Sequence, residues 1–158
     1  MLGDICENIN KNPDYVITPE EKEYIESQES LSFITSAENV NDAVLQKIAS
    51  SIDFMKCIKL SLGGASTVTE EGLYPLIDKA GNLTALDITE TKVKDIEELP
   101  SLQSLEASGG ALKSSTLSSW IDKHREIKVI TLQNFSDLNK EMLGMILSKG
   151  ENLETVPS

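Results

Sequence analysis

The chain has 158 residues, 39% hydrophobic and 25% charged, with a formal net charge of −12. This composition is typical of one globular domain with a continuous core, not of a disordered chain. Its acidity argues against binding nucleic acid or an anionic membrane surface, since both need Lys and Arg. It permits a basic partner, and it also keeps a domain soluble.

Residues 1–30 are expected to be helical. The motif Ile5-Cys6-x-x-Ile9 has helical spacing, and Pro13 would end that short helix. The motif Thr18-Pro19-Glu20-Glu21 then matches a capping box with proline at the first helical position. It predicts a second helix.

Two strands and two helices are predicted over residues 31–81. The strands are the apolar run at 31–34 and the segment 57–62, which Gly63-Gly64 ends. A helix capped by Asn41 or Asp42 is expected between them. Another is expected to begin at a capping box over 67–70 and to end near Gly81.

Further strands are predicted at 83–88, 102–107 and 127–132, with a sixth beginning at 153–156. The segment between the third and fourth strands has no room for a full helix, so a tight turn or one 3₁₀ turn is expected there. One helix is expected from Ser114 or Ser115 to Ile121. Another is expected to begin at Ser136 or Asp137, with apolar residues as far as Leu147, and Gly150 would end it.

Apolar residues recur at fixed offsets in these strands. The spacings between Leu31, Leu60, Leu86, Leu105, Ile130 and Val156 are 29, 26, 19, 25 and 26 residues. The four long units have room for a strand and a helix, and each helix supplies the crossover that a parallel strand needs. Periods of this size indicate a solenoid.

Over residues 31–158 these motifs resemble leucine-rich repeats, with the pattern L-x-x-L-x-L-x-x-N/C-x-L. The match is best at Leu83–Val93, and it departs where Thr91, Gly110 and Phe135 replace the Asn or Cys. The resemblance implies an α/β fold, a short curved solenoid with a parallel β-sheet on its concave side and helices on its convex side. It divides the chain into a helical N-terminal cap, 1–30, and about five to six irregular repeats, 31–158.

The resemblance further implies that the chain binds another protein, usually through the concave sheet. Strand alternation predicts three columns of side chains on that face. These columns are Ser30, Lys59, Ala85, Ser104 and Val129; Ser32, Ser61, Asp87, Glu106 and Thr131; and Ile34, Gly63, Thr89, Ser108 and Gln133. Asp87 and Glu106 are neighbours that could pair with a basic group or be solvated sheet residues. The candidate partner-binding residues are Lys59, Ser61, Asp87, Thr89, Glu106, Ser108, Thr131 and Gln133.

Nothing in the sequence points to an enzyme. No Cys or Ser occupies a nucleophile motif, no His/Cys spacing fits zinc, and neither Gly-Gly pair matches a phosphate-binding loop. His124, the only histidine, lies near a helix end, where a cationic residue suits the helix dipole. Cys57 lies in an apolar strand pattern, where a free cysteine acts as a small apolar residue. A disulfide between Cys57 and Cys6 remains an alternative. We expect no catalytic residue, no metal and no cofactor.

We therefore interpret the chain as a non-catalytic protein–protein interaction module, such as the recognition part of an adaptor or effector. The alternatives are a structural or self-associating module, or a fragment of a longer leucine-rich-repeat protein. The strand at 153–156 has no capping unit after it, and an open strand edge invites pairing with a second copy. No signal peptide or spanning apolar run is visible, so a cytoplasmic location is expected, with export by another kind of signal left open.

Overall fold

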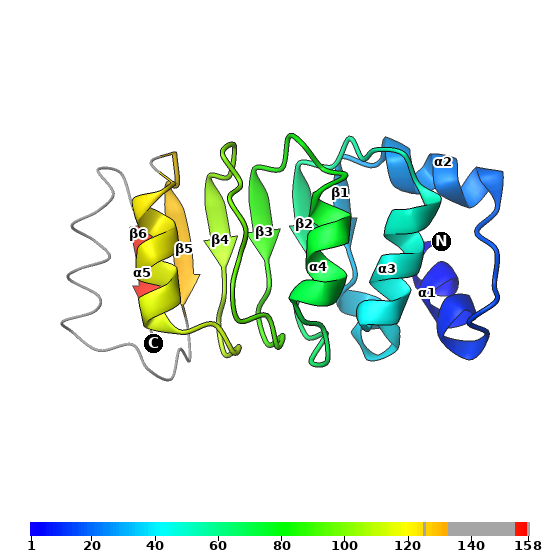
Figure 1. Cartoon of the computed structure of the whole chain (residues 1–158), viewed down its shortest axis with the longest axis horizontal. Helices are drawn as coiled ribbons and strands as arrows, with labels where there is room; N and C mark the ends of the chain where they lie inside the picture. The colour runs from blue at the N-terminus through cyan, green and yellow to red at the C-terminus, as the bar shows by residue number, and fades with distance from the viewer. Residues whose placement is uncertain (125, 133–153, 158) are drawn as a thin grey trace.

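The computed structural model describes residues 1–124, 126–132 and 154–157, and it has a mixed α/β fold. Six parallel strands form one sheet, and their order in the sheet follows the chain (Figure 1). The strands are β1 Ser30–Ser32, β2 Lys59–Ser61, β3 Ala85–Asp87, β4 Ser104–Glu106, β5 Val129–Leu132 and β6 Glu154–Pro157.

The helices occupy two places relative to this sheet. Figure 1 shows α3, α4 and α5 on one face of the sheet, and α1 and α2 beyond the β1 end. Their bounds are α1 Leu2–Lys11, α2 Pro19–Ser27, α3 Asp42–Ser51, α4 Glu70–Ile77 and α5 Ser114–Asp122, with a 3₁₀ segment η1 at Ile34–Asn39. Among the described residues, no helix is long and apolar enough to cross a membrane.

The strand register confirms the first two predicted columns from β1 to β5, whereas Ile34 of the third column lies in η1. Lys59 is opposite Ser30 and Ala85, and Asp87 is opposite Ser61 and Glu106. In β1 to β4 the central residue is buried, and its two neighbours are exposed or half-buried on the other face. We call this second face the open face; it comprises Ser30, Ser32, Lys59, Ser61, Ala85, Asp87, Ser104, Glu106, Val129 and Thr131.

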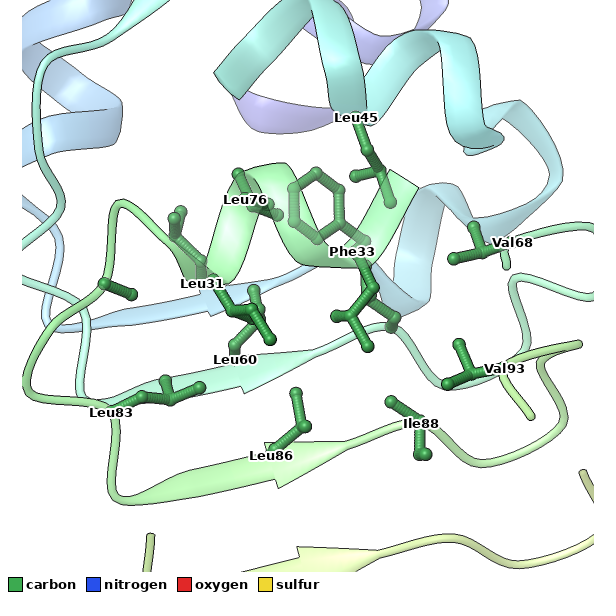
Figure 2. Close-up of a cluster of buried hydrophobic side chains, with 14 of the residues drawn as sticks. Leu31, Phe33, Leu45, Leu60, Val68, Leu76, Leu83, Leu86, Ile88 and Val93 are labelled. Atoms are coloured by element: carbon green, nitrogen blue, oxygen red, sulfur yellow. The ribbon is translucent and has the colours of Figure 1, made fainter. Parts of the chain in front are cut away.

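The core lies between the sheet and the helices. The central residues Leu31, Leu60 and Leu86 are each 2% exposed, and Leu45 of α3 and Leu76 of α4 are fully buried. Figure 2 shows these side chains packed together beneath the two helices. The repeated apolar positions of the sequence thus form one continuous core.

The N-terminal helices form as the sequence predicts. The Thr18 hydroxyl accepts a hydrogen bond from Glu21 N–H at 3.1 Å, and the Glu21 carboxylate accepts one from Thr18 N–H at 2.9 Å. This reciprocal pair is the predicted capping box. In α1 the apolar side, with Ile5, Cys6 and Ile9, is buried in the common core.

Helix α4 begins later than predicted, because its cap is Thr69 and not Thr67. The Asp42 carboxylate accepts from Thr69 N–H at 2.8 Å and from its hydroxyl at 2.6 Å. Thr69 Oγ1 in turn accepts from Glu71 N–H at 3.2 Å. A contact from another helix therefore sets this start. Gly81 lies beyond the end of the helix, which is Ile77.

Pro75 lies inside α4, where it leaves the carbonyl of Glu71 without its usual helical donor. The Gln46 side chain of α3 supplies that donor, because its Nε2 lies 2.9 Å from Glu71 O. Helices α3 and α4 also approach closely at Gly72, where an added Cβ would lie 2.8 Å from the Asp42 Cα. The two helices are thus fixed side by side.

Other segments depart from the predictions in detail. No helix forms between β3 and β4, as predicted; of the two predicted alternatives, the segment has turns, at residues 89–90 and 100–101, and no 3₁₀ turn. In the sixth strand, Thr155 and not Val156 is opposite Ile130, so this unit is one residue shorter than predicted. Strand β6 pairs only with β5, and self-association through its edge stays a prediction. The helix predicted to begin at Ser136 or Asp137 lies outside the described residues, and so does the site residue Gln133.

Candidate functional site

The open face carries a hollow of about 310 Å³ that spans β1 to β4. It lies over the polar columns of the sheet, on the side away from the helices. Ile34 lines it at the β1 end, and its side chain is 53% exposed. The residues that line the hollow are Ser30, Leu31, Ser32, Ile34, Lys59, Leu60, Ser61, Ala85, Leu86, Asp87, Ser104 and Glu106.

Asp87 is held in place by the backbone and by a neighbouring strand. Its Oδ1 accepts a hydrogen bond from Thr89 N–H at 2.9 Å, and its Oδ2 accepts one from the Ser61 hydroxyl at 3.0 Å. Gly63 leaves room for this carboxylate, since an added Cβ would lie 3.0 Å from Oδ2. Asp87 is therefore a fixed negative charge, not a freely solvated one.

Glu106 is the neighbour of Asp87 on β4 and is exposed. Burial of its carboxyl in part, together with repulsion by the Asp87 charge, raises the pKa of Glu106. Among the described residues neither carboxylate forms an ion pair, although Lys59 lines the same hollow. A basic group placed between them would relieve that repulsion.

The predicted site residues on the described strands lie on one face of the sheet, but not all of them line the hollow. Lys59, Ser61, Asp87 and Glu106 line it. Thr89 follows β3, and its hydroxyl accepts from Ser108 N–H at 3.4 Å. Ser108 and Thr131 thus continue the face beyond the hollow. The sequence reasoning left Ser30, Ser32, Ile34, Ala85 and Ser104 out of the site, although it had placed them in the columns.

The two cysteines and the one histidine of the chain are buried. Cys6 and Cys57 are free and buried, so no disulfide joins them. Burial raises the pKa of the Cys6 thiol to about 12 and also raises the pKa of Cys57, which disfavours the nucleophilic thiolate. Among the described residues, no three His, Cys, Asp or Glu side chains converge to hold a metal ion.

His124 is neutral, so the interpretation from the helix dipole is wrong. The ring is 4% exposed, and burial lowers its pKa. Its Nδ1 lies 2.6 Å from Trp120 O, and its Nε2 accepts from Leu99 N–H at 2.8 Å. A carbonyl can only accept, so the single ring proton is on Nδ1. His124 therefore joins α5 to the chain segment before β4.

A second hollow lies on the helical side, and no sequence motif predicts it directly. This helical-side groove has a volume of about 590 Å³ and lies between α4 and α5, over the unit that has no helix. The one signal in the sequence was the 19-residue spacing between Leu86 and Leu105, which leaves no room for a helix in that unit. The lining residues are Tyr74, Asp95, Ile96, Glu97, Glu98, Ser115, Thr116, Ser119, Trp120 and Lys123.

Negative charge is concentrated around this groove. Partial burial, with the hydrogen-bonding and repulsive effects of the Asp78 carboxyl beside it, raises the pKa of Glu97 to about 7. Burial and the charges of Asp95, Glu70 and Glu97 raise the pKa of Tyr74 to about 12. One nearby cation, Lys123, lies 3.9 Å from Glu98 in an exposed pair, and such pairs contribute little.

Replacing Glu97 should change how the free energy of unfolding depends on pH. The folded chain retains the Glu97 proton up to about pH 7, whereas the unfolded chain releases it near the ordinary value of 4.5. The free energy of unfolding therefore falls as pH rises between these values. We expect Glu97→Gln to be more stable than the wild type by about 1 kcal/mol at pH 8, after allowance for solvent screening, and nearly equal to it at pH 4.

Urea unfolding at the two pH values measures this difference. The exposed neighbour Glu98 supplies the control, because Glu98→Gln removes a carboxyl whose charge is well solvated. A gain by Glu97→Gln that is equal at both pH values would contradict the assignment.

The comparisons with known proteins identify no family. No protein-family model and no curated protein matches the sequence. Among solved structures, the chain is similar to one in the structure of the Chaetomium Mex67:Mtr2 subunits. The alignment covers 94% of this chain and 99% of that chain, with 12% sequence identity and a TM-score of 0.41. A similarity at this TM-score indicates neither a family nor a function.

Proposed function

We propose that this chain is a leucine-rich-repeat solenoid that binds another protein through the open face of its sheet. The observation that carries the proposal is the open face itself, with in-register polar columns, a hollow and an exposed apolar residue. No catalytic step is proposed for it.

Support for the solenoid comes from hydrogen bonds that recur from one unit to the next. In the units of β1 to β4, the backbone N–H just after the strand donates to the carbonyl of the residue that lies opposite the strand's last column residue on the next strand. Phe33 N–H donates to Ser61 O in this way, and Leu62 N–H donates to Asp87 O. Ile88 N–H to Glu106 O and Ala107 N–H to Thr131 O continue the series. Each unit is thus bonded mainly to its neighbours, as in a repeat array.

Thr91 supports the resemblance at the position where leucine-rich repeats have Asn or Cys. Its side chain is 4% exposed, and its hydroxyl donates to Ile88 O at 2.8 Å and accepts from Val93 N–H at 3.4 Å. Gly110 has no such group, and its Cα lies against the Thr91 carbonyl, where an added Cβ would be 3.2 Å away. One unit of the array therefore has the internal hydrogen bonds that the family pattern provides.

Support for protein binding comes from the chemistry of the open face. Small side chains leave its backbone accessible, Ile34 offers apolar contact area, and Asp87 with Glu106 offers a paired negative charge. A protein segment with a basic side chain beside an apolar one would satisfy all three features. Asp87 and Glu106 lie on strands, which keeps their backbone rigid and lowers the entropy lost on binding.

Affinity capture from a lysate of the source organism, read by mass spectrometry, tests this proposal. The variant Glu106→Lys reverses an exposed charge in the hollow and should lower the amount of captured partner about tenfold or more. Asp87 is left unchanged because its carboxylate holds two hydrogen bonds that the fold uses.

The matched control is Glu20→Lys, the same charge change on the exposed surface of α2. Circular dichroism of both variants checks that the fold is intact. Partners that Glu106→Lys retains as well as Glu20→Lys does would rule out the open face as their binding surface.

A further inference from the structure

Helices α3 and α4 pack side by side over the sheet, but the next helix, α5, is separated from α4. The unit between Leu83 and Leu102 supplies a strand and no helix, and Figure 1 shows β3 and β4 without a helix in front of them between α4 and α5. Buried residues of the connecting segment, Val93, Ile96 and Leu99, close the core there. Above them lies the helical-side groove, the larger of the two hollows described here.

The walls of this groove combine aromatic rings with carboxylates. Tyr74 comes from α4 and Trp120 from α5, and the connecting segment supplies Asp95, Glu97 and Glu98. Trp120 is fixed in the wall, because its indole N–H donates to Glu97 O at 3.1 Å and its ring stacks on His124 at 3.8 Å. Lys and Arg side chains are recognised by such sites, since the aliphatic stem lies on a ring and the charge meets a carboxylate.

Other occupants fit this groove less well. A metal ion would need converging ligands, and no such group of side chains occurs among the described residues. Nucleic acid would be repelled by the carboxylates. A second copy of the chain would bring its own net charge of −12 to an acidic surface.

We propose that the helical-side groove binds a segment of a partner protein rich in Arg and Lys, which occupies the place left without a helix between α4 and α5. The basic side chains pair with Asp95, Glu97 and Glu98, and the aliphatic stems lie against the half-buried Tyr74. Burial, together with the hydrogen bond and the repulsion of the Asp78 carboxyl, raises the pKa of Glu97 to about 7, and a cation that binds beside Glu97 favours its charged form. This surface is separate from the open face, so it does not depend on the function proposed above.

Trp120 is the only tryptophan of the chain and lines the helical-side groove, so the tryptophan fluorescence of the protein reports on this groove. The probe is a synthetic amphipathic peptide of about four helical turns, built from Arg, Lys, Leu and Ala. We expect the peptide to change the Trp120 emission in a saturable titration, and we expect binding to weaken as NaCl screens the charges. The same peptide with Glu in place of Arg and Lys should give no change.

The decisive comparison uses two variants with equal changes of net charge. Asp95→Asn/Glu98→Gln replaces two of the three carboxylates in the groove with nearly isosteric neutral groups and should weaken peptide binding about tenfold. Glu20→Gln/Glu23→Gln makes the same change on exposed residues of α2, at the other end of the molecule, and should leave binding within about twofold (Figure 1).

Calorimetric titration of both variants and the wild type gives the affinities independently of fluorescence. Equal weakening in the two variants would mean general attraction to an acidic protein and would overturn the proposal. Binding seen by calorimetry without any change at Trp120, or no binding at all, would overturn it as well.

Discussion

Leu86→Ala is expected to lower the free energy of unfolding by about 3 kcal/mol, because it opens a cavity at the middle of the sheet. Leu86 is 2% exposed and is the central residue of β3. It is opposite Leu60 (Figure 2) on one side and, by the strand register, opposite Leu105 on the other, so both neighbouring strands lose contacts. Urea unfolding followed by circular dichroism measures the difference.

Ile34→Ala is the matched control for this prediction, since it also removes three carbon atoms from an aliphatic side chain. Ile34 is 53% exposed, and its truncation should change the free energy of unfolding by less than about 0.5 kcal/mol. If the two truncations had similar effects, the burial assigned to Leu86 would be wrong. The same control shows that Ile34 is available for binding, not needed for stability.

The repeated apolar positions predicted the strands and their register well. Successive side chains of a strand point to opposite faces, so the apolar positions of the L-x-x-L-x-L motifs decide which face is buried. A shift by one residue would put Leu60, Leu86 and Leu105 in solvent. Burial of those leucines therefore fixes the columns of the open face. The caps at Thr18 and Asn41 were also predictable, because each acts within its own helix.

The start of α4 was not predictable from its own residues. Thr67 and Thr69 both suit a cap, and local sequence cannot choose between them. The choice is made by Asp42, which lies on α3 and binds the backbone and hydroxyl of Thr69. Gln46 similarly compensates for Pro75 from outside the helix. Such contacts between units depend on the packing angle of two helices, which periodicity does not specify.

The candidate site was predictable in part for the same reason. The columns gave the identity of the side chains on the open face, including Lys59, Asp87 and Glu106. They did not give the hydrogen bonds of Asp87 to Thr89 and Ser61, or the hollow that ends at Ile34. The helical-side groove was missed because it results from the absence of a helix, and a sequence pattern marks the elements that are present.

His124 shows how a residue with catalytic chemistry can serve the fold alone. Its two ring nitrogens join two segments that otherwise flank the helical-side groove: Nδ1 donates to Trp120 O, and Nε2 accepts from Leu99 N–H. The ring also stacks on Trp120 with an interplanar angle of 19°. The wall of the groove therefore depends on a neutral imidazole.

We expect His124→Ala to lower the free energy of unfolding by about 3 kcal/mol. It removes a buried ring and leaves the buried Leu99 N–H without a partner, which adds a desolvation penalty to the lost packing. His124→Phe retains a ring of similar size against Trp120 and loses only the hydrogen bonds. It should therefore lower the free energy of unfolding by less, about 2 kcal/mol.

The pH dependence separates the imidazole from packing effects. The folded-state pKa of His124 lies below its ordinary value of 6.5, so the unfolded chain binds the proton first, and stability is lost as pH falls through about 6.5. Neither variant can titrate there. The stability difference between wild type and His124→Phe should therefore shrink between pH 7.5 and 5.5, while the Glu97 contribution, common to both proteins, cancels. Urea unfolding across this range measures the difference, and a constant value would show that His124 keeps an ordinary pKa and is not held neutral by Leu99 and Trp120.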